Sequence, residues 1–328
     1  MDSGKVLKIV NDDLYLEKLK PCCYFPFLSG IIRGCAELIF TPKGFAMYFQ
    51  SSDDKLIQLV KEIINKLIDE DFQVEKSYID KGYLKGYFYT LNLPVENAQT
   101  ILEKCKIIEN RCEIIDKIPS ELVAKTCCKS AYLRGLFLSC GTLSTPPEAV
   151  GGMSGKTKAG YHLEFGVNSE VVREDIKNLL TAFAQVKKSQ IGFRTKKSGI
   201  YVKTAEAICN ILAAMGSNNG VIAVQQIITS REMKNQVNRA SNFVLANINK
   251  SISAGEKQLE AIKRIEETIG LDSLPPTIKE VAYLRMNNLD ATLNELALMC
   301  VPPSTKSAIN HRLRKLVQTA SEIIDTKE

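Results

Sequence analysis

Cysteine is the residue type in this sequence with the widest choice of chemistry, and three cysteines recur at an offset of 105 residues (from 22 to 127). The two sets are Cys22, Cys23 and Cys35, and Cys127, Cys128 and Cys140. Thiolates bind soft metal ions, and paired thiols form disulfides. Zinc-binding cysteines are usually separated by two other residues. We therefore interpret the adjacent pairs as packing residues at helix starts and expect no metal and no cofactor. For Cys35 and Cys140, a soft-metal site and a redox disulfide are alternatives to buried, unreactive thiols.

Basic residues gather between positions 186 and 204, a segment that contains no aspartate or glutamate. Its cations are Lys187, Lys188, Arg194, Lys196, Lys197 and Lys203. If the segment is a hairpin, alternation places Lys188 and Arg194 on one face and Ile191 and Phe193 on the other. Such a face could contact phosphates, and the alternative is an ordinary solvated surface. The matching hairpin nearer the N-terminus is weaker, because the face shared by Lys85, Tyr87 and Tyr89 lies close to several acids.

A polar segment at 231–254 reads as a helix with asparagine and basic residues on one face. Asn235, Asn238, Arg239 and Asn242 follow helical spacing and could contact phosphates or base edges, with hydrogen bonding between domains as an equal alternative. Gly255 is expected to separate this helix from the next one, which ends at Gly270.

The last sixty residues carry the pattern of a helix-turn-helix. Thr277 with Glu280, and Thr292 with Glu295, have the spacing of capping boxes. Prolines at 302 and 303 then break the chain before a final helix whose polar and basic start suits the DNA major groove. The candidate DNA-binding residues of this helix are Ser304, Thr305, Lys306, Ser307, Asn310, His311, Arg312, Arg314 and Lys315.

Two similar series of elements must position these groups. Segments 20–38 and 125–143 align without gaps, and each is followed by strand, helix, hairpin and helix signals. Both halves therefore read as helix, two strands, helix, two strands, helix. Gly30 and Gly34 in one repeated helix, and Gly135 and Ser139 in the other, predict that the two helices pack closely about a pseudo-twofold axis.

Composition limits the broad class of protein. The chain has 328 residues, 45% of them hydrophobic and 24% charged, which is typical of a globular protein. No apolar run is long enough for a membrane span, and the N-terminus lacks the apolar core of a secretory signal. Ten cysteines without such a signal indicate reduced thiols in the cytoplasm. The net charge of +6 does not by itself require a nucleic-acid partner.

The repeated helices resemble a known motif. LSGIIRGCA (28–36) and LRGLFLSCG (133–141) look like two degenerate copies of the LAGLIDADG motif of homing endonucleases. The resemblance implies an α+β fold of two pseudo-symmetric αββαββα halves, whose antiparallel sheets form a saddle over duplex DNA.

That family places one carboxylate from each motif helix at the centre of the saddle, where the pair holds divalent metal. The matching positions here are Cys35 and Cys140, and thiols are poor ligands for magnesium. Arg33 and Leu138 occupy the earlier acidic position of the motif, and Glu37 is matched by Thr142. We therefore expect no catalytic residues and no nuclease activity.

Further segments resemble the sporulation transcription regulator WhiA family. They are NQVNR (235–239), ANINK (246–250) and TKSAINHRLRKL (305–316), and the match runs over nearly the whole chain. This resemblance implies a LAGLIDADG-like domain followed by an all-α, sigma-region-4-like helix-turn-helix. It also implies a cytoplasmic, nucleoid-associated regulator of sporulation, cell division or chromosome segregation.

The sequence thus predicts four segments: the two LAGLIDADG-like halves at 1–115 and 116–220, a linker helix at 221–254, and the helix-turn-helix at 255–328. The expected partner is double-stranded DNA, with other transcription regulators or RNA polymerase components as further candidates and no membrane. The expected function is sequence-specific regulation of transcription by an inactive endonuclease scaffold. An active metal-dependent endonuclease and a non-specific nucleoid or RNA-binding protein are the alternatives.

Overall fold

The computed structural model describes residues 2–81, 84–147, 160–194 and 198–325. The chain divides into two compact units, Met1–Met233 and Lys234–Glu328. Lys196 and Lys197, two of the basic residues named above, lie outside the described residues.

The first unit contains the two expected halves. The first half comprises α2 (Tyr24–Cys35), β1 (Ala36–Thr41), β2 (Gly44–Ser51), α3 (Asp54–Ile68), β3 (Val74–Lys81), β4 (Leu84–Leu93) and α4 (Val95–Lys104). The second comprises α5 (Thr126–Cys140), β7 (Gly141–Ser144), β8 (His162–Phe165), α6 (Glu170–Ala182), β9 (Ile191–Arg194), β10 (Gly199–Val202) and α7 (Ala205–Met215). Both follow the αββαββα order, so the predicted fold class is confirmed. Short elements add η1 (Pro21–Cys23), β5 (Ile108–Glu109), β6 (Glu113–Ile114) and η2 (Lys188–Gln190).

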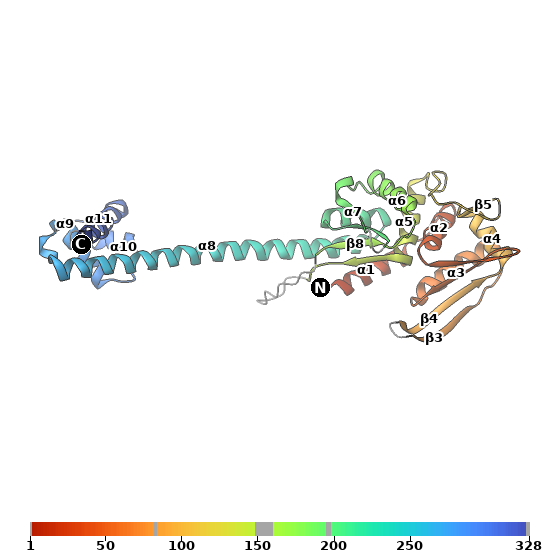
Figure 1. Ribbon diagram of the computed structural model, residues 1–328, viewed down its shortest axis with the longest axis horizontal. Helices are drawn as coiled ribbons and strands as arrows, with labels where there is room; N and C mark the ends of the chain where they lie inside the picture. The colour runs from red at the N-terminus through yellow and green to blue at the C-terminus, as the bar shows by residue number, and fades with distance from the viewer. Residues whose placement is uncertain (1, 82–83, 148–159, 195–197, 326–328) are drawn as a thin grey trace. The chain divides into compact units, whose positions relative to one another are not determined.

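Each half builds one antiparallel sheet with the same topology. The strand orders are β1-β2-β4-β3 and β7-β8-β10-β9. Alternate side chains of the first sheet, such as Phe49 and Leu91, are buried among residues of α3 and α4. Figure 1 shows α3 running beside β3 and β4. In the second sheet, Leu163 and Ile200 are buried in the same manner with α6 and α7. Each sheet therefore has one face covered by helices and an outer face that carries the intervening residues.

Helices α2 and α5 pack directly on each other, as the small residues predict. A Cβ atom added to Gly30 would lie 2.3 Å from the carbonyl oxygen of Tyr132, and one added to Gly135 would lie 2.2 Å from that of Phe27. The two glycines therefore occupy equivalent places, and each lets the backbone of the other helix approach. The expected pseudo-twofold pairing of the repeated helices is confirmed.

Helix α1 (Ser3–Leu16), which no sequence motif predicts, joins the core of the second half although it precedes the first. Val6, Val10 and Leu14 repeat at helical spacing and are fully buried in that core. The carboxylate of Asp13 accepts hydrogen bonds from the hydroxyl of Ser217 at 2.9 Å and the backbone N–H of Gly220 at 3.0 Å. These bonds tie α1 to the start of the long helix α8 (Asn218–Thr268).

The second unit contains the later part of α8, η3 (Leu271–Ser273), α9 (Pro276–Asn287), α10 (Leu293–Met299) and α11 (Lys306–Asp325). Two expectations about its boundaries are wrong. Gly255 does not end a helix but lies inside α8, because a glycine in open surroundings costs a helix only about 1 kcal/mol. Thr277 does not cap α9, which starts one residue earlier at Pro276, where the ring presets the helical φ angle.

Among the described residues, no helix combines the length and apolar character that crossing a membrane requires.

Candidate nucleic-acid interface

The final helix is held by a short, well-satisfied turn. Thr292 and Glu295 form the predicted capping box at the start of α10: the backbone N–H of each donates to the side chain of the other. After α10, the backbone N–H of Ser304 donates to the carbonyl of Ala297 at 2.8 Å. Thr305 then caps α11 by accepting from the N–H of Ala308 at 3.2 Å. Fixed bonds on both sides of the break thus set the direction of α11.

One face of α11 is buried, and the candidate DNA-binding residues lie around the rest of the helix. Ile309, Leu313 and Leu316 are fully buried against residues of α8, α9 and α10. The exposed candidates are Thr305, Lys306, Ser307, His311, Arg314 and Lys315, and the partly buried ones are Ser304, Asn310 and Arg312. Among the described residues, none of the four lysines and arginines of this set forms an ion pair, so their charges remain available to phosphates.

A second polar face lies on α8. Asn235, Asn238, Arg239 and Asn242 are all exposed and share one side of the helix by their spacing. The apolar side of this stretch is also exposed, since Val237 retains 64% of its accessible surface. All residues of α8 from 235 to 254 are exposed, so neither side of this stretch is buried.

The basic segment of the second half differs from its predicted geometry. Lys187 and Lys188 precede the strand, in the cap and first residue of η2, so they do not share a sheet face with Arg194. Lys203 is exposed just after β10, and its ammonium nitrogen lies 4.9 Å from the centre of the Tyr201 ring. Only Arg194, among the described cations of this segment, is on a strand.

Arg194 is already engaged on the outer face of its sheet. Its Nε lies 2.9 Å from a carboxylate oxygen of Glu164, whose other oxygen lies 2.8 Å from Nε2 of His162. The ring of His162 stacks on that of Tyr201, with centroids 5.3 Å apart. The outer face of this sheet is therefore a linked polar cluster rather than a row of free cations.

The first sheet offers still less to a phosphate. Lys85, Tyr87 and Tyr89 do share a face, but the register places it on the side of Leu91, which packs against helices. The opposite, outer face carries Glu37 and Glu75, and among its described side chains there is no lysine or arginine. The face of Lys85 and Tyr87 is weakly basic, as expected, because Lys85 is exposed but pairs with the carboxylate of Asp80 at 3.1 Å.

The C-terminal ends of α2 and α5 bring Cys35 and Cys140 together at the centre of the saddle. Burial first, and then the neighbouring Cys140, raise the pKa of Cys35 to about 12. Burial likewise raises the pKa of Cys140 to about 11. Both thiols are therefore neutral near pH 7, and two thiols do not replace the pair of carboxylates that holds magnesium.

The remaining polar groups at this end are also committed to other partners. The guanidinium of Arg33 donates to the carbonyls of Ile115 at 3.0 Å and Lys117 at 2.7 Å. Glu37 accepts a hydrogen bond from the hydroxyl of Tyr48. No cluster of carboxylates suited to magnesium forms there among the residues described.

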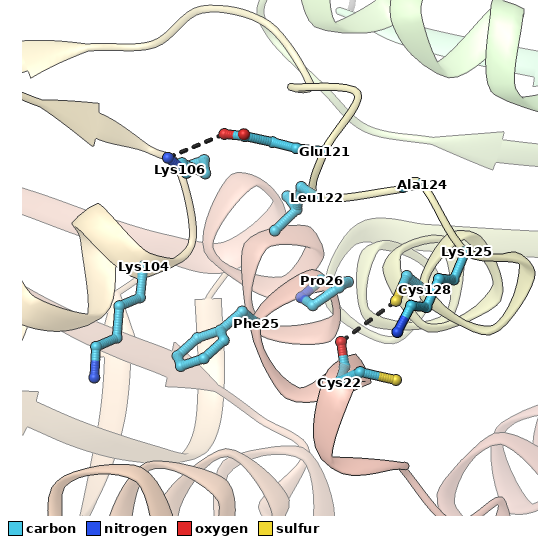
Figure 2. Close-up of a pocket in the computed structure, with 10 residues that line it drawn as sticks. All are labelled: Cys22, Phe25, Pro26, Lys104, Lys106, Glu121, Leu122, Ala124, Lys125 and Cys128. Carbon is cyan, nitrogen blue, oxygen red and sulfur yellow. Dashed lines mark hydrogen bonds and ion pairs between the residues drawn. The ribbon is translucent and has the colours of Figure 1, made fainter.

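The N-terminal ends of the same helices gather a different set of thiols. Cys22, Cys23, Cys127 and Cys128 have sulfur atoms that all lie within 4.8 Å of one another. The thiol of Cys128 also donates to the carbonyl oxygen of Cys22 at 3.3 Å, beside a pocket of about 310 Å³ (Figure 2). Spacing within either pair alone does not predict this cluster. The shared offset of 105 residues is the sequence signal that the pairs meet at the twofold axis.

Comparison with known proteins matches both units. Residues 129–234 match the model of the WhiA LAGLIDADG-like domain, and residues 237–320 match that of the WhiA C-terminal HTH domain. A probable cell division protein WhiA from Bacillus licheniformis is 34% identical over 309 residues, covering 93% of each chain. The protein of the same name from Bacillus subtilis (strain 168) is 34% identical over 308 residues, again covering 93% of each.

A solved structure gives the same fold. The crystal structure of full-length DUF199/WhiA from Thermatoga maritima aligns with a TM-score of 0.55 and 21% identity, covering 98% of both chains. Fold and matched domains define a class in which a LAGLIDADG-like scaffold with altered central residues precedes a helix-turn-helix. Within that class, the chain belongs to the WhiA family.

Proposed function

We propose that this protein is a sequence-specific DNA-binding regulator of transcription that reads duplex DNA with α11 and does not cleave it. The observation that supports the proposal best is the start of α11: a capped helix N-terminus with exposed lysine, serine and histidine beside unpaired cations. Residues at the start of a recognition helix meet base edges, and the cations that follow suit phosphates. Curated relatives are named as probable cell division proteins, so genes of division or sporulation are the proposed targets.

In this proposal the saddle contributes little to phosphate binding. Its described outer faces carry two carboxylates on one side and an arginine paired with Glu164 on the other. The saddle is instead proposed to bind other proteins, with other transcription regulators or RNA polymerase components as partners. The neutral thiols of Cys35 and Cys140 are the reason for proposing that the ancestral cleavage chemistry is lost.

The test is a competition binding assay on DNA fragments that the protein enriches from its own genome. Replacing both Lys306 and Asn310 by alanine should lower the preference for enriched over random duplex by about 10- to 100-fold, because each base contact contributes about 1–3 kcal/mol. Lys188→Ala removes one positive charge from the other unit and is the matched control, which should keep that preference.

Two results would contradict the proposal. One is equal affinity of the unaltered protein for enriched and random fragments at every salt concentration, which would make it a non-specific nucleic-acid binder. The other is magnesium-dependent cutting of duplex DNA, which would restore the endonuclease alternative.

A further inference from the structure

The four clustered cysteines lie where the two halves of the scaffold meet. Cys22 and Cys23 belong to the turn η1 that leads into α2, and Cys127 and Cys128 belong to the first turn of α5. Each pair is the pseudo-twofold counterpart of the other. All four are free thiols in the structure.

The distances between the sulfur atoms match those of a tetrahedral metal site. A zinc ion about 2.3 Å from four sulfurs at the corners of a tetrahedron separates those sulfurs by about 3.8 Å. Cys22 Sγ lies 3.8 Å from Cys23 Sγ and 3.8 Å from Cys127 Sγ, once within a pair and once across the axis. The whole set fits within 4.8 Å, so a metal would draw the sulfurs together only slightly.

The surroundings also suit a metal thiolate centre. Cys23 and Cys128 are 3% and 6% exposed, whereas Cys22 is exposed, so the cluster has a sheltered inner side and an open outer side. Four thiolates around zinc leave two negative charges, which the N-terminal ends of α2 and α5 stabilise. Lys125 lines the same pocket as Cys22 and Cys128 (Figure 2), and the exposed side chain of Cys22 leaves the outer side of the cluster open to solvent.

We propose that Cys22, Cys23, Cys127 and Cys128 bind one zinc ion that joins the two LAGLIDADG-like halves. Four sulfur ligands favour zinc over magnesium or calcium, and a full set of four protein ligands makes the site structural rather than catalytic. Binding displaces the four thiol protons to solvent. The ion then links residues 105 positions apart and holds the N-terminal ends of α2 and α5 together.

Disulfide formation is the competing chemistry for the same sulfurs, and the geometry favours it less. A disulfide requires two sulfurs about 2.05 Å apart, and each disulfide would join only two of the four sulfurs. The cluster instead places a third and fourth sulfur near any chosen pair.

The first test measures metal in the full chain, purified without an affinity tag under reducing conditions and then dialysed against zinc. Elemental analysis should find about one zinc ion per chain. Cobalt(II) in place of zinc should give the intense visible absorption of a tetrahedral thiolate complex. A chain that binds no metal, or one whose intact mass shows lost hydrogens from disulfides instead, would overturn the proposal.

Variants then assign the ligands. Cys22→Ser with Cys127→Ser should lose the zinc, whereas Cys35→Ser with Cys140→Ser, the other repeated pair on the same helices, should keep it. The assignment would be contradicted if the Cys22→Ser, Cys127→Ser variant kept its zinc. It would also be contradicted if only the Cys35→Ser, Cys140→Ser variant lost it.

An alkylation experiment on the unaltered chain does not depend on any variant folding. With zinc present, iodoacetamide should modify Cys22 at least tenfold more slowly than after chelation. Exposed Cys112, which lies outside the cluster, should react at the same rate in both samples. Equal rates for Cys22 with and without zinc would also overturn the proposal.

Discussion

The two ends of the α2 and α5 pair carry cysteines from the same repeat and yet offer different chemistry. At the C-terminal ends, the two desolvated thiols of Cys35 and Cys140 meet, and among the described residues no larger group of metal-binding side chains forms there. At the N-terminal ends, four thiols gather within 4.8 Å, and part of the set is open to solvent. Repetition of a residue therefore indicates where side chains meet, while the number of ligands and their exposure determine what they can do.

The close packing between the two ends is the feature whose loss should have the largest effect. Gly135→Val would force side-chain atoms against the carbonyl of Phe27, where even a Cβ would lie 2.2 Å away. We expect the free energy of unfolding of the first unit to fall by about 3 kcal/mol or more, because the contact is with backbone that cannot move aside. Chemical denaturation followed by circular dichroism measures the change.

A matched glycine substitution controls for the loss of glycine itself. Gly255 lies in α8, and a Cβ added there would meet no atom within 4 Å, so Gly255→Ala should stabilise its helix by about 0.5–1 kcal/mol. If Gly135→Val is as mild as Gly255→Ala, the two helices do not depend on close approach, and the comparison of their ends loses its basis.

Placing aspartates at the two motif positions now held by cysteine should let the C-terminal ends of α2 and α5 bind magnesium. Cys35→Asp with Cys140→Asp places two carboxyl groups in a desolvated site, so we expect a loss of several kcal/mol at neutral pH. Magnesium should raise the melting temperature of this variant and leave that of the unaltered protein unchanged, because carboxylate oxygens bind magnesium and thiols do not.

Cys112→Asp, a single acid at an exposed site, is the control for the added negative charge. An equal response of the unaltered protein to magnesium would show that its C-terminal ends still hold a cation site.

A smaller effect should appear at alkaline pH. The ordinary thiol pKa is 9.0, whereas Cys35 and Cys140 in the folded chain have pKa values of about 12 and about 11. As pH rises above 9, the unfolded chain loses these protons before the folded chain does, so the free energy of unfolding falls. Compared with Cys35→Ala plus Cys140→Ala, the unaltered protein should lose about 1 kcal/mol or more between pH 9 and about 11. Parallel pH profiles would mean that these thiols are not desolvated.

Much of the fold followed from the sequence because periodicity is a local signal and the repeat is visible without a structure. The order of elements and the capping box at Thr292 depend on residues near one another in the chain, and the 105-residue repeat marked the helix pair. The start of the final helix was found in the same way. Its role in binding DNA stays a prediction.

Features that depend on long-range packing were missed or misjudged. Helix α1 carries no signal of its destination, because its partners follow some 200 residues later: Ser217 bonds to Asp13 across 204 positions. Arg194 was expected to be a free cation, but in the folded sheet it forms an ion pair with Glu164. Alternation alone also left open which face of the first sheet the helices cover.

The placement of α1 has a consequence for how the protein is made. Its apolar row, Val6, Val10 and Leu14, is made before the rest of this core, and Val224 and Ile227 of the same core follow more than two hundred residues later. Desolvation raises the pKa of Asp13, and hydrogen bonds from Asn219, Gly220 and Ser217 outweigh it, so the carboxylate gains its full set of partners only once those residues exist. During synthesis the apolar side of this helix is therefore exposed to water until its partners have been made. In that period it can bind chaperones or aggregate with other chains.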